Sequence, residues 1–209
     1  MRNIQPQTII EIGSFVGIST IWMASGLKAS GQNGVIHAID LFYEIMPYFP
    51  YRCGYAKDPL TFAQAAVSSA QLAHRIHFYR MNSYEMGQHF YNIINIRIDL
   101  LYIDGDHSIR SCINDLALFS PYVSPGEYIA LHDIYPEHCG YDGPRYIIDH
   151  FIKNSSFFSL IEIKTAPHNY GMAIIQKLKK GGNFYSGVSL TLDFIRAWAR
   201  LKNTAPWQN

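Results

Sequence analysis

Several features are scarce in this chain of 209 residues, and each absence excludes a class of protein. Charged residues make up 16% of the chain and the formal net charge is +1, so the basic surplus of a nucleic-acid-binding protein is missing. The three cysteines are scattered and odd in number, which argues against a disulfide framework or a CxxC metal site. No basic-then-apolar leader and no membrane-length apolar run occurs. We therefore expect a cytoplasmic protein without nucleic-acid or membrane partners.

The stretch Thr8 to Thr20 (TIIEIGSFVGIST) organises the rest of the chain. Its β-branched start predicts a buried strand, Gly13 and Gly17 bound a turn, and helical spacing then runs from Ile18 to about Ala29. Strand, glycine turn and helix form the first half of a βαβ unit, whose turn lets a ligand approach the backbone. The alternative is an ordinary turn whose glycines serve chain geometry alone.

A second predicted strand, Gly34 to Asp40, ends in an acid. A carboxylate at this place can accept hydrogen bonds from both hydroxyls of a ribose. The dinucleotide pattern GxGxxG is absent, because the glycine turn reads ExGxxxGxS. The pair of motifs therefore favours a nucleoside ligand without a pyrophosphate over a nicotinamide dinucleotide.

Strands and helices are predicted to alternate along the rest of the chain. The predicted helices are Leu60–Ala73, Tyr84–Asn92, Ile109–Phe119 and Gly143–Asn154, and the predicted strands are Arg75–Arg80, Asp99–Asp104, Glu127–Leu131, Phe157–Thr165 and Tyr170–Gln176. The last two strands flank a turn and predict a hairpin. The pattern indicates an α/β fold with a mostly parallel, doubly wound sheet and an antiparallel edge.

Residues 41–59 (LFYEIMPYFPYRCGYAKDP) interrupt this alternation with three prolines and many tyrosines. Loops of this length inside a domain are uncommon unless they are functional. Because the loop follows Asp40, we weigh a lid over a bound ligand equally against a surface loop held by its own aromatic side chains.

Ionisable residues gather where the predicted strands end. In open α/β sheets ligands bind beyond the carboxyl ends of the strands, so several such groups at one edge indicate a site. These residues are Glu11, Asp40, Asp104, His107, His132 and Asp133.

The motifs ExGxxxGxS and AIDLF resemble the cofactor motifs of class I S-adenosylmethionine-dependent methyltransferases. The later pieces DGDHS and LHD resemble a narrower group, the small-molecule O-methyltransferases related to macrolide-sugar O-methyltransferases and to the proteins named cephalosporin hydroxylase. The resemblance covers about Thr8 to Gln176. It implies a Rossmann-like sheet of seven strands.

The resemblance also implies S-adenosylmethionine as the cofactor and O-methylation of a hydroxyl on a small molecule, such as a sugar or natural product. Ser83 would lie near the adenine. The full set of cofactor contacts implied is Glu11, Gly13, Ser14, Gly17, Ser19, Asp40, Ser83 and Asp104.

Catalysis is expected to involve Asp104, His107 and Asp133. His107 matches a residue well placed as general base, and an imidazole is largely neutral and proton-accepting at physiological pH. The alternative is a histidine at a helix entry that is hydrogen-bonded to backbone.

Metal-dependent relatives imply a magnesium site made by Asp104 and an acidic pair matching His132 and Asp133. His132 departs from that pattern, and an imidazole ligand weakens magnesium or favours manganese or iron. Neighbouring strand residues point to opposite faces, so joint ligation by His132 and Asp133 requires the strand to end between them. The alternative is that neither residue binds a metal.

We assign residues 1–178 to the methyltransferase domain and 179–209 to a C-terminal tail. In the tail, Ser189–Leu201 predicts an amphipathic helix that docks on its own sheet or on a second subunit, which would make a homo-oligomer. Only seven residues precede the first strand, so the chain looks minimal or truncated. A cofactor-binding scaffold or partner subunit without catalysis is therefore the second hypothesis. A base methyltransferase is disfavoured because Asp104 is not followed by the Pro-Pro-aromatic motif.

Overall fold

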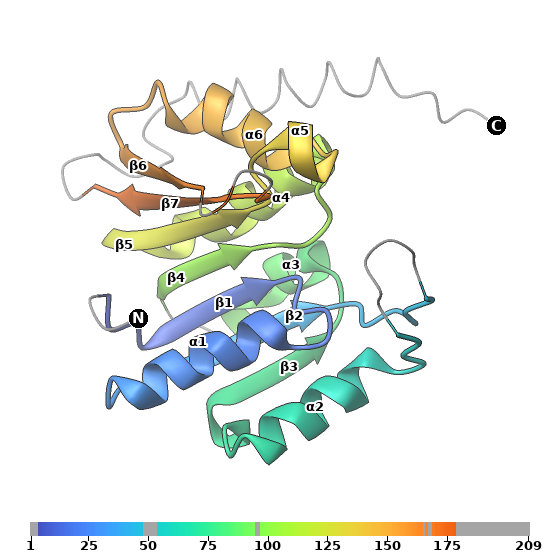
Figure 1. Ribbon diagram of the computed structural model, residues 1–209. Helices are drawn as coiled ribbons and strands as arrows, with labels where there is room; N and C mark the ends of the chain where they lie inside the picture. The colour runs from blue at the N-terminus through green and yellow to red at the C-terminus, as the bar shows by residue number, and fades with distance from the viewer. Residues whose placement is uncertain (1–3, 48–53, 95–96, 165, 167–168, 179–209) are drawn as a thin grey trace. The chain divides into compact units, whose positions relative to one another are not determined.

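The computed structural model describes residues 4–47, 54–94, 97–164, 166 and 169–178 (Figure 1). Their strands form one seven-stranded sheet with the order β3-β2-β1-β4-β5-β7-β6. The chain divides into two compact units, the first ending at Gly105 and the second beginning at Asp106. Within the part of the chain described, no helix combines the length and apolar content that crossing a membrane requires.

The first unit holds four parallel strands. β1 pairs with β2 on one side and with β4 on the other, and β2 pairs with β3. The strands are β1 (Thr8–Ile12), β2 (Val35–Asp40), β3 (Ile76–Arg80) and β4 (Ile98–Ile103). All five residues of β1 are buried, as expected for a strand with neighbours on both sides. Because the strands are parallel, their carboxyl ends share one edge of the sheet.

The first unit also contains the helices α1 (Ile18–Ala29), α2 (Pro59–Ser69) and α3 (Ser83–Ile93) and the short 3₁₀ helix η1 (Ala73–Arg75). α1 buries Met23, Ala24 and Leu27, whereas Trp22 is 74% exposed. The bulkiest side chain of this helix therefore lies outside the core.

The second unit contributes an antiparallel group in which β7 pairs with β5 and with β6. Its strands are β5 (Val123–His132), β6 (Phe158–Ile163) and β7 (Met172–Lys177). Its helices are α4 (Ile109–Phe119), α5 (Pro136–Cys139) and α6 (Gly143–Ile147), the 3₁₀ helix η2 (Ser120–Tyr122) and the π-helical turn η3 (Ile148–Ile152).

These elements confirm the predicted fold class, seven strands with an antiparallel edge hairpin. Three local predictions were wrong: β5 starts at Val123 instead of Glu127, the helix predicted to reach Ala73 ends at Ser69, and the helix from Gly143 to Asn154 is α-helical only to Ile147 before it widens into η3. The short helix α5 was not predicted.

The ends of the 41–59 loop are described, and residues 48–53 are not. Ile45 and Ala56 form an antiparallel bridge, and the Tyr55 hydroxyl donates to Glu44 at 2.5 Å. Asp58, just before α2, pairs with Arg80 at the end of β3. The role of the 41–59 loop as a lid stays a prediction. The predicted tail helix lies in residues 179–209, outside the described part of the chain. The predicted domain boundary after residue 178 coincides with the end of the described part and also stays a prediction.

Candidate active site

The glycine turn of the first unit lies directly against the end of β4. Gly13 has a φ of +84° and donates its N–H to the Ile39 carbonyl at 2.9 Å. A Cβ on Gly13 would lie 2.1 Å from the carbonyl oxygen of Asp104, which no side chain could occupy. Both the dihedral angle and the contact therefore require glycine at this position.

At the other end of the turn, Gly17 has a φ of +82° and begins α1 without a side-chain cap. The first turn of α1 also contains no acidic residue, so its N–H groups are oriented toward the turn without a carboxylate of their own. Ser14, inside the turn, is 1% exposed, and its Oγ has no hydrogen-bond partner. A buried hydroxyl in this state is expected to have a ligand or a water as its partner.

Asp40 ends β2 and lies beside the glycine turn, as predicted. Its Oδ2 accepts a hydrogen bond from the Phe15 N–H at 2.8 Å, and its Oδ1 accepts one from the Phe42 N–H at 2.6 Å. These two bonds fix the carboxylate between the two loops. An ionised carboxylate offers about four lone-pair sites, so both oxygens can accept a further bond.

Glu11 is enclosed beneath the turn instead of facing it. The side chain is 0% exposed and accepts hydrogen bonds from Ser19 Oγ at 2.5 Å and from Thr20 Oγ1. Burial raises the pKa of Glu11 to about 7, although the two hydroxyls oppose this and the nearby Asp104 and Asp40 charges add to it. Glu11 and Ser19, both predicted to contact a cofactor, therefore hold α1 against β1. Thr20 was not singled out, although it lies in the same motif.

Ser83 and Asp104 occupy the remaining strand ends of the first unit. Ser83 is the first residue of α3 and is half-buried, and the Met81 N–H donates to the Asp40 carbonyl at 3.1 Å. The backbone just before Ser83 is thus tied to the residue that ends β2. Asp104 follows β4, and its Oδ2 accepts from the Tyr102 hydroxyl at 3.2 Å.

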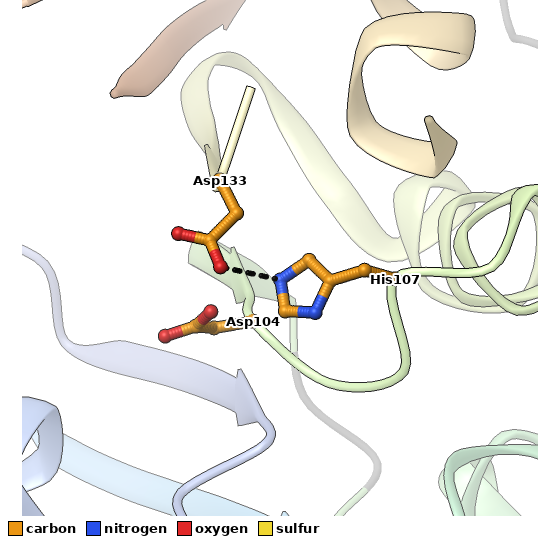
Figure 2. A group of neighbouring side chains, drawn as sticks. All are labelled: Asp104, His107 and Asp133. Atoms are coloured by element: carbon orange, nitrogen blue, oxygen red, sulfur yellow. Dashed lines mark ion pairs between the residues drawn. The ribbon is translucent and has the colours of Figure 1, made fainter. Parts of the chain in front are cut away.

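In the second unit, His107 and Asp133 face each other (Figure 2). His107 Nε2 lies 3.5 Å from Asp133 Oδ2, and each side chain is 15% exposed. The imidazole stacks on Tyr141 with ring centroids 5.7 Å apart, and the Gly143 N–H donates to the His107 carbonyl at 3.1 Å. The His107 ring is therefore positioned by its own loop and by the start of α6.

His132 and Asp133 meet as well, because β5 ends between them. Asp133 has a φ of +57°, a left-handed conformation that aspartate tolerates better than most residues. The turn brings His132 Nδ1 to 2.6 Å from Asp133 Oδ1. This contact is not a hydrogen bond, and Oδ1 is buried without one. The strand thus ends between the two residues, but His132 is not in the group of described residues whose ligand atoms lie close enough to hold one metal ion.

The backbone around Asp133 is held from several sides. The Asp133 N–H donates to the Gly171 carbonyl at 3.0 Å, and Cys139 Sγ donates to the Asp133 carbonyl at 3.3 Å. Arg145 Nε donates to the Ile134 carbonyl at 3.0 Å, and its guanidinium binds both oxygens of Glu162 at 3.0 and 2.9 Å. Hydrogen bonding to Glu162 raises the pKa of Arg145. No local sequence pattern pointed to this support.

The other acid of the DGDHS motif, Asp106, has a structural task. It accepts hydrogen bonds from the Ser108 N–H at 3.0 Å and from Ser111 Oγ at 2.7 Å, at the start of α4. Burial works against its ionised form, but the bonds from Ser111 and Ser108 lower the pKa of Asp106. It therefore stabilises the helix that follows His107.

Solved structures with the same fold include an O-methyltransferase from Bacillus cereus in complex with S-adenosylhomocysteine. It is 17% identical, covers 84% of this chain and 76% of its own, and has a TM-score of 0.63. The O-methyltransferase TomG from Streptomyces achromogenes, in complex with S-adenosylmethionine and involved in tomaymycin synthesis, is 17% identical over 85% of this chain and 75% of its own, with a TM-score of 0.63. At these identities the likeness shows the fold.

A short sequence match links the chain to an uncharacterized protein of Acanthamoeba polyphaga mimivirus. The two are 50% identical over 36 residues, which is 17% of this chain and 16% of the viral protein. The family described as "Methyltransferase domain" matches residues 10–134, more than half of the chain. The chain therefore belongs to this methyltransferase family, which confirms the resemblance of its motifs to class I S-adenosylmethionine-dependent methyltransferases.

Proposed function

We propose that the chain binds S-adenosylmethionine at the strand ends of the first unit and methylates a hydroxyl of a small molecule, such as a sugar or natural product. The observation that carries this proposal is Asp40, anchored by the Phe15 and Phe42 N–H groups with lone pairs to spare for a ribose. The family and the two O-methyltransferases with the same fold support the reaction class.

The residues of the first unit fit such a cofactor. The glycine turn packs tightly on the backbone of Asp104 through Gly13 and on Ala63 through Gly17, and between them Ser14 Oγ is buried without a hydrogen-bond partner. The uncapped start of α1 suits the carboxylate of a methionine end. When bound, the cofactor supplies a methyl group on a sulfonium sulfur, and the chain supplies alignment and a proton acceptor.

His107 is the group that we assign to proton acceptance. Asp133 Oδ2 lies 3.5 Å from His107 Nε2, a contact that is not a hydrogen bond, so the carboxylate acts on the ring through its charge. It stabilises the imidazolium that forms when the ring takes the hydroxyl proton. Asp104 joins them in this proposal because it precedes His107 by three residues, at most about 11 Å of extended chain.

A divalent cation is a second element of the proposal. Asp104, His107 and Asp133 are a group of described residues whose side chains suit such an ion. Two carboxylates and an imidazole suit manganese or iron better than magnesium. His132 was predicted in this set but is not in that group, although its Nδ1 lies 2.6 Å from Asp133 Oδ1. When bound, the ion would lower the pKa of the acceptor hydroxyl.

Binding calorimetry of the Asp40→Ala variant tests the cofactor site. Each charge-assisted hydrogen bond contributes roughly 1.5–3 kcal/mol, so the dissociation constant for S-adenosylmethionine should rise at least about tenfold. Glu85→Ala, which removes an exposed acid from α3, should leave the affinity unchanged. Unchanged affinity in Asp40→Ala would reject the ribose assignment. Tighter binding of NAD than of S-adenosylmethionine by the unmodified chain would reject the cofactor class.

A further inference from the structure

Tyr141 is an aromatic residue beside the candidate base, with no task yet in the proposed reaction. It lies between the short helix α5 and the start of α6, and 56% of its surface is exposed. Its ring stacks on His107, with ring centroids 5.7 Å apart and 30° between the planes. Because more than half of this side chain faces solvent, it adds little to the core of the second unit.

The backbone on both sides of Tyr141 is fixed. On one side, Cys139 Sγ is shared between the Tyr141 carbonyl at 3.5 Å and the Asp133 carbonyl at 3.3 Å. On the other side, the Gly143 N–H donates to the His107 carbonyl, and a Cβ on Gly143 would lie only 2.3 Å from that oxygen. Only glycine lets the start of α6 pack this closely on the His107 loop. Contacts with the backbone of His107 and Asp133 therefore hold the exposed ring in its place.

Tyr141 borders the exposed part of the His107 imidazole. The side chains of His107 and Asp133 are each 15% exposed, so solvent reaches only a small part of this pair. Asp133 Oδ2 lies 3.5 Å from His107 Nε2, and the Tyr141 ring stacks on the imidazole (Figure 2). A hydroxyl that approaches the imidazole therefore passes close to Tyr141. The molecule that carries the hydroxyl then lies against the Tyr141 ring.

An exposed aromatic ring favours acceptors of one shape. Aromatic rings pack best against a flat partner, through offset stacking or through C–H groups directed at the negative face of the ring. A second aromatic ring offers such a surface, and so does the apolar face of a pyranose. An open-chain polyol has no fixed flat face, and holding it in one shape costs conformational entropy. Contact with Tyr141 therefore favours cyclic acceptors over open-chain ones.

We propose that Tyr141 selects the methyl acceptor by packing against a flat ring that carries the reacting hydroxyl. The acceptor ring lies on the exposed part of Tyr141, and its hydroxyl is directed to His107. Tyr141 touches the acceptor and takes no part in the proton transfer. This inference rests on the proposed methyl transfer, to which it adds the shape of the acceptor and the residue that recognises it.

Kinetics of Tyr141 variants with three acceptors test the proposal. The acceptors are catechol, methyl β-D-galactopyranoside and galactitol, which offers a similar row of hydroxyls without a ring. Tyr141→Ala should raise the KM of at least one of the two cyclic acceptors at least about tenfold. Its kcat should stay unchanged, because the ring contact is made equally before and during the reaction. Tyr141→Phe keeps the ring and should keep the KM. The response of catechol and of the galactoside tells an aromatic acceptor from a pyranose.

Saturation-transfer NMR measures the binding of the same three molecules without turnover. The unmodified chain should bind at least one cyclic probe more tightly than galactitol, and Tyr141→Ala should lose that preference. Ile161→Ala, which removes an exposed side chain from β6 of the same unit, is the control and should change neither binding nor KM. Melting temperatures of Tyr141→Ala and the unmodified chain should be close, because the Tyr141 ring is mostly exposed.

The two measurements separate this proposal from the proposed function. Cyclic probes that do not bind, that bind equally to Tyr141→Ala, or that lose as much affinity in Tyr141→Phe would overturn the role of Tyr141, even if methyl transfer occurs. An equal loss for galactitol would overturn it as well. Binding of a cyclic probe that depends on Tyr141, without transfer of a methyl group, would support the ring contact and reject the proposed reaction.

Discussion

At the scale of single residues, the His107 and Asp133 pair leads to the most direct catalytic prediction. His107→Ala and Asp133→Ala should each lower kcat by roughly 10²–10⁴-fold, the range for a lost general base, without changing cofactor affinity. Release of S-adenosylhomocysteine in the presence of hydroxylated compounds measures the rate, and calorimetry measures the affinity. His150→Ala, a histidine of η3 bonded to the Tyr146 carbonyl, is the control. Full activity of His107→Ala would remove the proton-acceptor role from this residue.

The S-adenosylhomocysteine release assay also tells whether Asp104, His107 and Asp133 bind a metal ion or act through proton acceptance at His107 alone. If an ion is held by Asp104, His107 and Asp133, then EDTA should abolish methyl transfer and manganese should restore it more fully than magnesium. Full activity in EDTA would eliminate the ion and leave proton acceptance at His107.

Glu11 leads to a prediction about stability and pH. Its pKa is about 7 in the folded chain and 4.5 in an unfolded one, so the folded state binds the proton more tightly. The stability that this group contributes is therefore lost as pH rises from 4.5 to 7, on the order of 3 kcal/mol in all. Glu11→Gln, which cannot ionise, should be more stable than the unmodified chain at pH 8. Urea unfolding should show that advantage shrinking toward pH 5, and an advantage independent of pH would contradict the raised pKa.

At the scale of elements, Arg145 connects α6, β6 and the turn after β5. Arg145→Ala removes two bonds to Glu162 and the bond to the buried Ile134 carbonyl, which should cost about 2 kcal/mol of stability. Lys153→Ala removes an exposed salt bridge to Asp149, close to Glu162, and should cost less than about 0.5 kcal/mol of stability. Urea midpoints compare the two variants. Equal effects would mean that the Ile134 contact adds nothing.

The elements also show how far local sequence patterns reach. α1 and α4 begin and end as predicted, because glycine or serine precedes each and its apolar spacing is regular. The early start of β5 escaped prediction because Pro125 and Gly126 look like a turn, and pairing with β7 covers only its later residues. The π turn in η3 includes Phe151, which packs against Ile113 of α4, a contact that local spacing does not record.

The candidate site also has features that could be predicted from the sequence and features that could not. The positions of Gly13, Gly17 and Asp40, at the carboxyl ends of parallel strands, were predictable from the strand, glycine turn and helix pattern, and their binding role stays a prediction. The left-handed turn at Asp133 and the burial of Glu11 under α1 did not follow, because each depends on contacts with residues far away or on the other side of the strand. Arg145 reaches Glu162 across 17 residues, a distance at which a single sequence carries no signal.

At the scale of the whole molecule, His37 and Glu11 have opposite effects on how stability changes with pH. Burial lowers the pKa of His37 to about 4, with a smaller effect of His77, so the stability that it contributes is lost as pH falls from 6.5 toward 4. Glu11 acts in the other direction between pH 4.5 and 7. The two effects, each on the order of 3 kcal/mol, nearly cancel between pH 5 and 6.5.

A variant that lacks one of the two groups should reveal the other. His37→Gln should be more stable at pH 5 than at pH 7, whereas the unmodified chain should change little over that range. Melting temperatures at the two values measure the difference. The reverse order in the variant would show that Glu11 is not the group opposing His37.

The contact between Gly13 and Asp104 has a consequence for how this sequence can vary. Three glycines illustrate three degrees of tolerance: Gly13 is excluded from change by a carbonyl 2.1 Å from its missing Cβ, Gly31 has open space but a φ of +69°, and Gly54 has neither restriction. In a library of random substitutions, position 13 should retain glycine alone, position 31 should also accept asparagine, and position 54 should accept most residues. Gly54 can therefore be replaced during evolution, whereas Gly13 cannot, because Asp104, more than ninety residues away along the sequence, occupies the space of a side chain.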